Sequence, residues 1–86
     1  MAVYVILSLE ANSALEERIV ALFPEDNYKL SDRQWLVSSN KIAKAISDDL
    51  GASDGKYGQL MVFWAVGYFG WWSKTVWDWL KLKEQN

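Results

Sequence analysis

Tryptophan is concentrated at one end of this chain. Five of the six tryptophans lie within the last 23 of the 86 residues. They are Trp64, Trp71, Trp72, Trp77 and Trp79. Each large aromatic side chain removes about 150–250 Å² of surface from water when it is buried. We expect residues 1–86 to form a single domain, and a domain of this length has only a modest core. We therefore expect a partner to cover part of this aromatic surface.

The chain contains neither cysteine nor histidine. Disulfides, thiol nucleophiles and cysteine-based zinc sites are excluded, and the most frequent general base and metal ligand is absent. This composition favours a non-enzymatic protein without a metal or other cofactor. Small secreted domains are often held together by disulfides, so the lack of cysteine also favours a cytoplasmic location.

Charge and hydropathy narrow the class of partner. The net charge is -2, with 9 basic and 11 acidic residues. Nucleic-acid-binding proteins usually carry a basic stripe, so nucleic acid is a possible partner that the charge does not favour. The most apolar stretch, residues 60–72, is interrupted by two glycines. It is shorter than the roughly 18–20 residues that span a membrane, so we expect no membrane partner.

Alternating apolar residues and turn signals predict four β-strands. These are residues 2–9, 28–31, 34–39 and 59–66. The first and last strands are apolar at successive positions, which indicates that both of their faces are covered. Residues 31–34 are expected to form the turn between the second and third strands.

Helical periodicity and capping residues predict three helices. The expected N-caps are Ser13, Asn40 and Ser73, and the helices should end near residues 23, 50 and 82. Glu16 would complete a capping box with Ser13. Gly51 suits the position after the second helix, where a left-handed backbone is common.

The predicted element order is β-α-β-β-α-β followed by a third helix. This order is typical of an α+β, ferredoxin-like fold with a four-stranded antiparallel sheet. Two helices would cover one face of the sheet, and the other face is normally open. The glycine-rich residues 51–58 are expected to form a mobile loop between the second helix and the last strand.

Three segments together resemble small, mostly uncharacterised bacterial and phage proteins with a Cas2-like fold of the ferredoxin type. They are VYVILSLE, WLVSSNKIAKAISDDLG and VFWAVGYFGWWSKTVWDWL. The resemblance implies the fold and a tendency to dimerise. Cas2-type nucleases carry an aspartate near the end of the first strand, paired across a dimer to hold a metal. The matching region here is Ser8-Leu9-Glu10, in which the acid is a glutamate.

Nine apolar residues are expected to form a partner-binding surface. They are Tyr4, Ile6, Met61, Phe63, Tyr68, Phe69, Trp71, Trp72 and Trp79. The first four are expected on the sheet face opposite the two covering helices. Leaving four such side chains in water would forgo about 6–12 kcal/mol, so the third helix or a second copy should cover them.

The third helix has one face suited to covering the sheet. Val76, Trp77 and Leu80 share this face at helical spacing. Trp79 lies about 200° from Trp77 on a helical wheel, so both rings cannot be buried in the same way. The helix therefore accounts for only part of the aromatic cluster.

The sequence supports three hypotheses of function. The leading one is a protein-interaction or regulatory and inhibitory module, related to phage or mobile-element proteins, that acts as a homodimer or with another protein. The second is a Cas2-like metal-dependent nuclease or nucleic-acid-binding protein, for which Ser8, Glu10 and Asp32 would be tested. The third is a single-strand binder that stacks bases on exposed aromatic rings. Its stacking residues would be Tyr4, Phe63 and Trp64.

Overall fold

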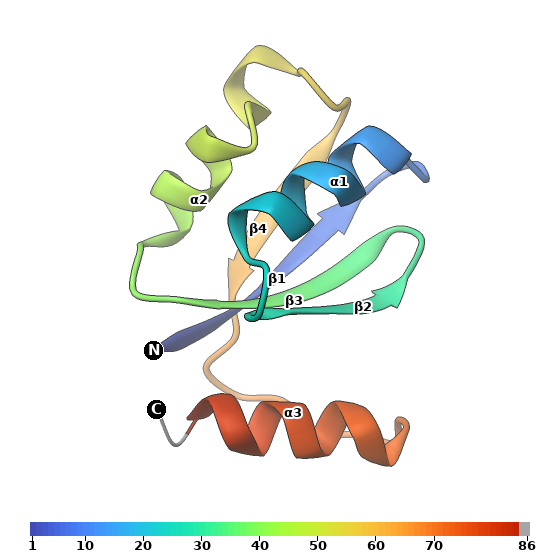
Figure 1. Ribbon diagram of the computed structural model, residues 1–86, viewed down its shortest axis with the longest axis vertical. Coiled ribbons are helices and arrows are strands. Elements are labelled where there is room, and N and C mark those ends of the chain that lie inside the picture. Colours follow the sequence, from blue (N-terminus) through green and yellow to red (C-terminus); the bar gives the residue numbers. More distant parts are fainter. Residues whose placement is uncertain (85–86) are drawn as a thin grey trace.

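The computed structural model describes residues 1–84 of the chain (Figure 1). It is an α+β structure with a four-stranded antiparallel sheet and three α-helices. The strands are β1 (Ala2–Ser8), β2 (Asn27–Ser31), β3 (Gln34–Ser39) and β4 (Leu60–Trp64). The helices are α1 (Ser13–Leu22), α2 (Ala43–Asp49) and α3 (Lys74–Glu84), and a short 3₁₀ helix, η1 (Ala52–Asp54), follows α2.

The strands lie in the order β2-β3-β1-β4, and every neighbouring pair is antiparallel. The connection through α1 passes over β3, and the connection through α2 passes over β1. Both crossovers lie on the same side, so α1 and α2 cover one face of the sheet (Figure 1). The third helix, α3, lies across the opposite face.

Two hydrophobic layers share the sheet between them. The larger layer joins the sheet to α1 and α2, and its buried residues are Tyr4, Ile6, Leu15, Ile19, Phe23, Trp35, Val37, Ile46 and Leu50. The smaller layer joins the sheet to α3 through Val3, Leu36, Val76 and Leu80. Successive side chains of a strand point to opposite faces, so β1 contributes to both layers. The prediction that Val76 and Leu80 turn back onto the sheet is confirmed.

The expectation that Tyr4 and Ile6 lie on the face opposite the two covering helices is wrong. Both are buried beneath α1 and α2, and the Tyr4 hydroxyl donates a hydrogen bond to the Lys41 carbonyl at 2.6 Å. The sequence of β1 is apolar at successive positions, so it carries no signal for which set of side chains meets the helices. The same expectation is correct for Met61 and Phe63, which pair with Leu7 and Val5 and face the α3 side.

The N-cap of α1 is Asn12 and not Ser13. The Asn12 side-chain oxygen accepts a hydrogen bond from the Leu15 amide at 3.1 Å, which places Ser13 at the first helical position. Glu16 forms an ion pair with Lys29 of β2 at 2.7 Å. A long-range contact therefore engages the carboxylate that the sequence assigned to a local capping box.

The start of α2 also differs from the prediction. The helix begins after Ile42 without a side-chain cap, so Asn40 does not cap it. The Ser39 hydroxyl instead accepts a hydrogen bond from the Lys41 amide at 3.0 Å. Gly51 follows the helix with φ of 65°, in the left-handed region, as expected. Ser73 directly precedes α3. No helix among residues 1–84 is long and apolar enough to cross a bilayer.

Truncation of Ile6 tests the assignment of faces in β1. Ile6 is completely buried in the larger layer, so Ile6→Ala should lower the free energy of unfolding by about 2–5 kcal/mol. Val20→Ala, on the exposed side of α1, should change it by about 0.5 kcal/mol or less. Urea denaturation followed by circular dichroism measures both. Equal effects of the two substitutions would contradict the burial of Ile6.

Candidate interaction surface

The edge of β4 is open to solvent along the whole strand. β4 pairs with β1 on one side, and no strand among residues 1–84 pairs with it on the other. The Ala65 amide donates to the Val3 carbonyl, and the Leu9 amide donates to the Gln59 carbonyl. Main-chain groups alternate in direction along an antiparallel strand. The main-chain groups of Met61 and Phe63 therefore bond to β1. The main-chain groups of Leu60, Val62 and Trp64 point outward, away from β1.

The side chains of β4 are apolar on both faces and largely exposed. Met61 and Phe63 are 57% and 42% exposed on the α3 side of the sheet. Trp64 is 64% exposed on the side of α1 and α2, where it lies opposite Tyr4. The strand belongs to an uncharged stretch that runs from residue 57 to residue 73. An edge with these properties is a site where other strands add to a sheet.

Residues 65–73, here called the aromatic loop, connect β4 to α3. Phe69 is fully exposed, and Trp71 is 97% exposed. Trp72 is half exposed, and Val66 is more exposed than Trp72. Monomeric proteins rarely leave large apolar side chains grouped on their surface, and such groups mark interaction sites. Tryptophan and tyrosine are also among the residues that most often contribute the largest share of the binding energy at interfaces.

An apolar groove separates the aromatic loop from the sheet. Its volume is about 230 Å³. Val5, Leu30 and Leu36 line it from the strands, and Val76, Trp77 and Leu80 line it from α3. The loop side chains Tyr68, Phe69, Trp71 and Trp72 form its remaining wall. Since Val5 pairs with Phe63, the groove and the exposed part of β4 are neighbours on one sheet face. We call this combined region the aromatic surface: Met61, Phe63, Phe69, Trp71 and Trp72.

Trp77 and Trp79 pack on opposite sides of α3. The Trp77 ring lies 6.3 Å from the Tyr68 ring, and the Trp79 ring lies 6.1 Å from the Tyr28 ring in an edge-on arrangement. Both tryptophans are half-buried, as expected from their angular separation on the helix. Trp79 therefore stabilises the contact between α3 and β2 and contributes little exposed area.

An ion pair holds the C-terminal end of α3. The Lys83 ammonium lies 2.7 Å from the Asp26 carboxylate, and the Lys83 side chain is only 12% exposed. The same ammonium lies 5.9 Å above the Trp79 ring. Lys81 and Lys83 also occupy the last turn of the helix, where positive charge complements its dipole.

The Tyr68 hydroxyl is buried beside the Glu84 carboxylate at the end of α3. Burial, and to a lesser degree the Glu84 carboxylate near it, raise the pKa of Tyr68 to about 12. Both effects disfavour the phenolate, because a charge is poorly solvated there and repels a second negative group. Tyr68 thus lines the groove in its neutral form.

The raised pKa of Tyr68 makes stability depend on alkaline pH. The folded state keeps the proton between pH 10 and 12, whereas the unfolded state loses it near pH 10. This contribution to the unfolding free energy is complete below pH 10 and disappears as the pH rises toward 12. Tyr68→Phe should lose less stability over that interval than the unmodified protein. Urea denaturation at a series of pH values measures the difference, and parallel curves would contradict the assignment.

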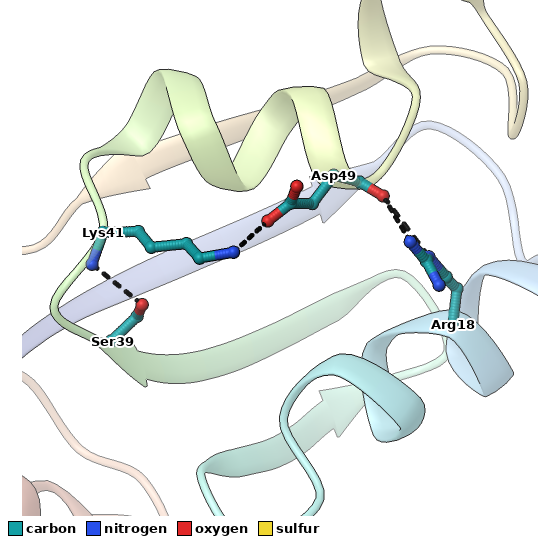
Figure 2. A network of polar contacts seen from close by, with 4 residues as sticks. All are labelled: Arg18, Ser39, Lys41 and Asp49. Carbon is teal, nitrogen blue, oxygen red and sulfur yellow. Dashed lines mark hydrogen bonds and ion pairs between the residues drawn. The ribbon is translucent and has the colours of Figure 1, made fainter.

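The acidic residues of α2 are engaged by basic side chains. The Lys41 ammonium forms an ion pair with the Asp49 carboxylate (Figure 2), and the distance between the two groups is 2.6 Å. The Asp49 carbonyl accepts hydrogen bonds from two nitrogens of the Arg18 guanidinium, each at 3.3 Å. Asp48 pairs with Lys44 at 2.9 Å. Of these contacts, the one between Arg18 and Asp49 joins α1 to α2, on the sheet face opposite the aromatic surface.

The residues suggested for a nuclease lie at the far end of β1. Ser8 is buried, and its hydroxyl donates to the Glu10 carbonyl at 2.6 Å. Glu10 is exposed, and Asp32 forms an ion pair with Lys29 at 3.2 Å in the turn after β2. Within residues 1–84, no three histidine, cysteine or acidic side chains lie together as a metal site would need.

A wide cleft opens at the same end of the sheet. Its volume is about 1040 Å³. Apolar residues Leu7, Leu9, Leu60 and Met61 form one part of its lining. Ser8, Arg33 and Asp54 are among its polar lining residues. The cleft therefore adjoins the beginning of β4, where the aromatic surface starts.

The structure distributes the nine expected surface residues over three environments. Met61, Phe63, Phe69, Trp71 and Trp72 are exposed together. Tyr68 and Trp79 are half-buried beside α3. Tyr4 and Ile6 are buried and unavailable to a partner. Trp64 and Val66 are exposed as well, although neither is among the nine predicted surface residues.

Comparison with known proteins identifies no relative. No family model matches the chain, and no curated protein or solved structure is significantly similar to it. The resemblance to Cas2-like proteins is therefore a hypothesis, and function has to be argued from the surface of the molecule.

Proposed function

We propose that this protein is a non-enzymatic protein-interaction module that acts as a homodimer and regulates or inhibits a larger complex. The carrying observation is the exposure of Phe69 and Trp71 beside the apolar strand β4, one edge of which has no partner strand among the described residues. A partner that covered these side chains would remove two almost fully exposed aromatic rings from water. A related origin among phage or mobile-element proteins is part of the same proposal.

The exposed aromatic area is of the size that a specific interface needs. At about 150–250 Å² for each large aromatic side chain, the exposed parts of the five most exposed rings amount to roughly 500–900 Å². These rings are Phe63, Trp64, Phe69, Trp71 and Trp72. A standard protein–protein interface buries about 800 Å² on each partner. The aromatic surface and Trp64 together therefore supply enough area for one interface.

We also propose that the α+β fold is of the ferredoxin-like type. This assignment is supported by two consecutive crossovers through α1 and α2 and by the strand order β2-β3-β1-β4. The additional helix α3 occupies part of the sheet face that such folds leave open. The uncovered remainder of that face is the aromatic surface, which favours association over a fully self-contained domain.

Replacement of the two most exposed rings tests the interaction module. The unmodified protein should sediment as a dimer of the 9.9 kDa chain at tens of micromolar. Phe69→Ser and Trp71→Ser should each raise the dissociation constant by about 30-fold, because interface hot spots contribute about 2 kcal/mol or more. Sedimentation equilibrium over a concentration series measures these constants.

Val20→Ser is the matched control. Arg18 points from α1 toward α2, and Val20 lies about 200° around the helix from it, so Val20 faces away from α2 and β4. Val20→Ser removes an exposed apolar side chain and should leave the dissociation constant unchanged. A monomeric unmodified protein at tens of micromolar would refute the homodimer.

The second candidate function is a Cas2-like metal-dependent nuclease or nucleic-acid-binding protein. It is favoured by two clefts at the end of β1, a wide one lined in part by Ser8 and a smaller one lined in part by Glu10. Carboxylates at such a position could bind Mg²⁺ or Mn²⁺ if two copies contributed them.

Incubation with DNA and RNA in the presence of Mg²⁺ or Mn²⁺ distinguishes the two candidates. The interaction module predicts no cleavage by the unmodified protein and no change with Glu10→Ala. Cleavage that Glu10→Ala abolishes, with circular dichroism unchanged, would replace the leading proposal with the nuclease.

A further inference from the structure

The two edges of the sheet are protected to different degrees. At the β2 edge, the Lys29 ammonium is held by the Glu16 and Asp32 carboxylates at 2.7 and 3.2 Å. The pairing of β2 with β3 contains a register shift between Lys29 and Ser31. Edge lysines and bulges are the features by which proteins prevent further strands from adding to a sheet.

The third helix protects the same edge. The Tyr28 hydroxyl lies 2.6 Å from the Thr75 hydroxyl, and the Tyr28 ring packs against Trp79. β2 is therefore covered by α3 and carries a charged side chain.

The β4 edge has none of these protections. Leu60, Val62 and Trp64 direct their main-chain amides and carbonyls outward, as the pairing with β1 requires. The nearest charged residues in the sequence are Lys56 and Lys74, both outside the strand. A partner strand therefore finds free hydrogen-bonding groups and apolar side chains on both faces.

We infer that β4 pairs with β4 of a second copy, antiparallel about a twofold axis at Val62, to form one continuous eight-stranded sheet. This inference rests on the proposed function, because it assumes that the protein forms a homodimer. Val62 is the middle residue of β4, so an axis there pairs all five residues of each strand. Its outward amide and carbonyl would bond directly to the partner subunit's Val62.

A second copy fits this edge better than an unrelated strand because the strand is complementary to itself. Like charges opposite one another destabilise a strand pair, and β4 contains no charge. A twofold axis at Val62 sets Trp64 opposite the partner subunit's Leu60. The hydrophobic rows on both faces of the sheet then continue across the axis.

The same pairing uses the remaining exposed apolar features. Antiparallel strands place the end of β4 in one copy beside the beginning of β4 in the other. The aromatic loop follows the end of β4, and the cleft lined by Leu7, Leu60 and Met61 lies at its beginning. Each loop is thereby brought next to the partner's cleft, where Leu7 and Met61 are exposed on the α3 side.

Single cysteines in β4 test the axis directly, because the chain has no cysteine of its own. Met61→Cys, Val62→Cys and Phe63→Cys are oxidised with copper phenanthroline and analysed on non-reducing gels. We expect a cross-linked dimer with the fastest rate at position 62, and no cross-link in Ser13→Cys on α1. Absence of cross-linking at all three positions, in protein that sediments as a dimer, would overturn the β4 pairing and leave the proposed function intact.

A proline substitution tests the outward hydrogen bonds. Proline is tolerated at edge positions whose amide faces solvent, so Val62→Pro should leave the monomer folded by circular dichroism while removing one bond to the partner. Its dissociation constant should rise at least tenfold above that of Val62→Ala, which keeps the amide. Equal dimerisation by the two variants would overturn the pairing.

Two further outcomes complete the test. If Val62→Pro fails to fold, Trp64→Lys takes its place, and loss of the dimer by this variant supports the pairing. If the unmodified protein is monomeric at tens of micromolar, the homodimer and the β4 pairing are both overturned. The edge would then be open to a strand of another protein.

Discussion

The packing of both faces of β1 is the interaction on which the rest of the structure depends. This central strand places Tyr4 and Ile6 under α1 and α2, and it places Val3 against α3. It also carries the hydrogen bonds that hold β3 on one side and β4 on the other. A polar group at a buried position of this strand needs a hydrogen-bond partner, as the Tyr4 hydroxyl has in the Lys41 carbonyl. β1 therefore determines the position of every other element, including the strand whose edge stays open.

The two layers are unequal, and the aromatic surface follows from that inequality. α1 and α2 together cover one sheet face, and a single helix crosses the other. α3 packs on Val3 and Leu36 and is fixed at β2 by Tyr28 and at the α1–β2 connection by Asp26. It therefore lies toward the β2 side of the sheet and leaves the β4 side uncovered. The aromatic loop spans the distance between β4 and α3, and its rings have too little sheet beneath them to be buried.

Much of the fold was predictable from the sequence because the signals were local. The hairpin turn near residues 31–34, the left-handed Gly51 and the buried positions Val76 and Leu80 each depend on neighbouring residues. The errors have long-range causes. Asn12 and Ser13 are adjacent residues with similar capping ability, and Glu16 of α1 pairs with Lys29 of β2 instead of completing a capping box with Ser13.

The candidate site was predictable in composition and not in position. The surplus of aromatic residues indicated that some rings would be exposed, and Phe69 and Trp71 are. The face of Tyr4 and Ile6 was not predictable, since alternation fails as a signal in a strand that is apolar at every position. The exposure of Trp64 follows from its place at a sheet edge, which only the strand order reveals.

The difference between the two sheet edges also limits how far an assembly can grow. Identical subunits that add head to tail continue without end, whereas a twofold interface consumes the same surface on both subunits. Two copies joined through β4 present only their β2 edges to the outside, and each of these carries Lys29, a register shift and α3. Such an assembly is closed at two subunits. Protection of one edge thus permits an apolar opposite edge without polymerisation into fibres.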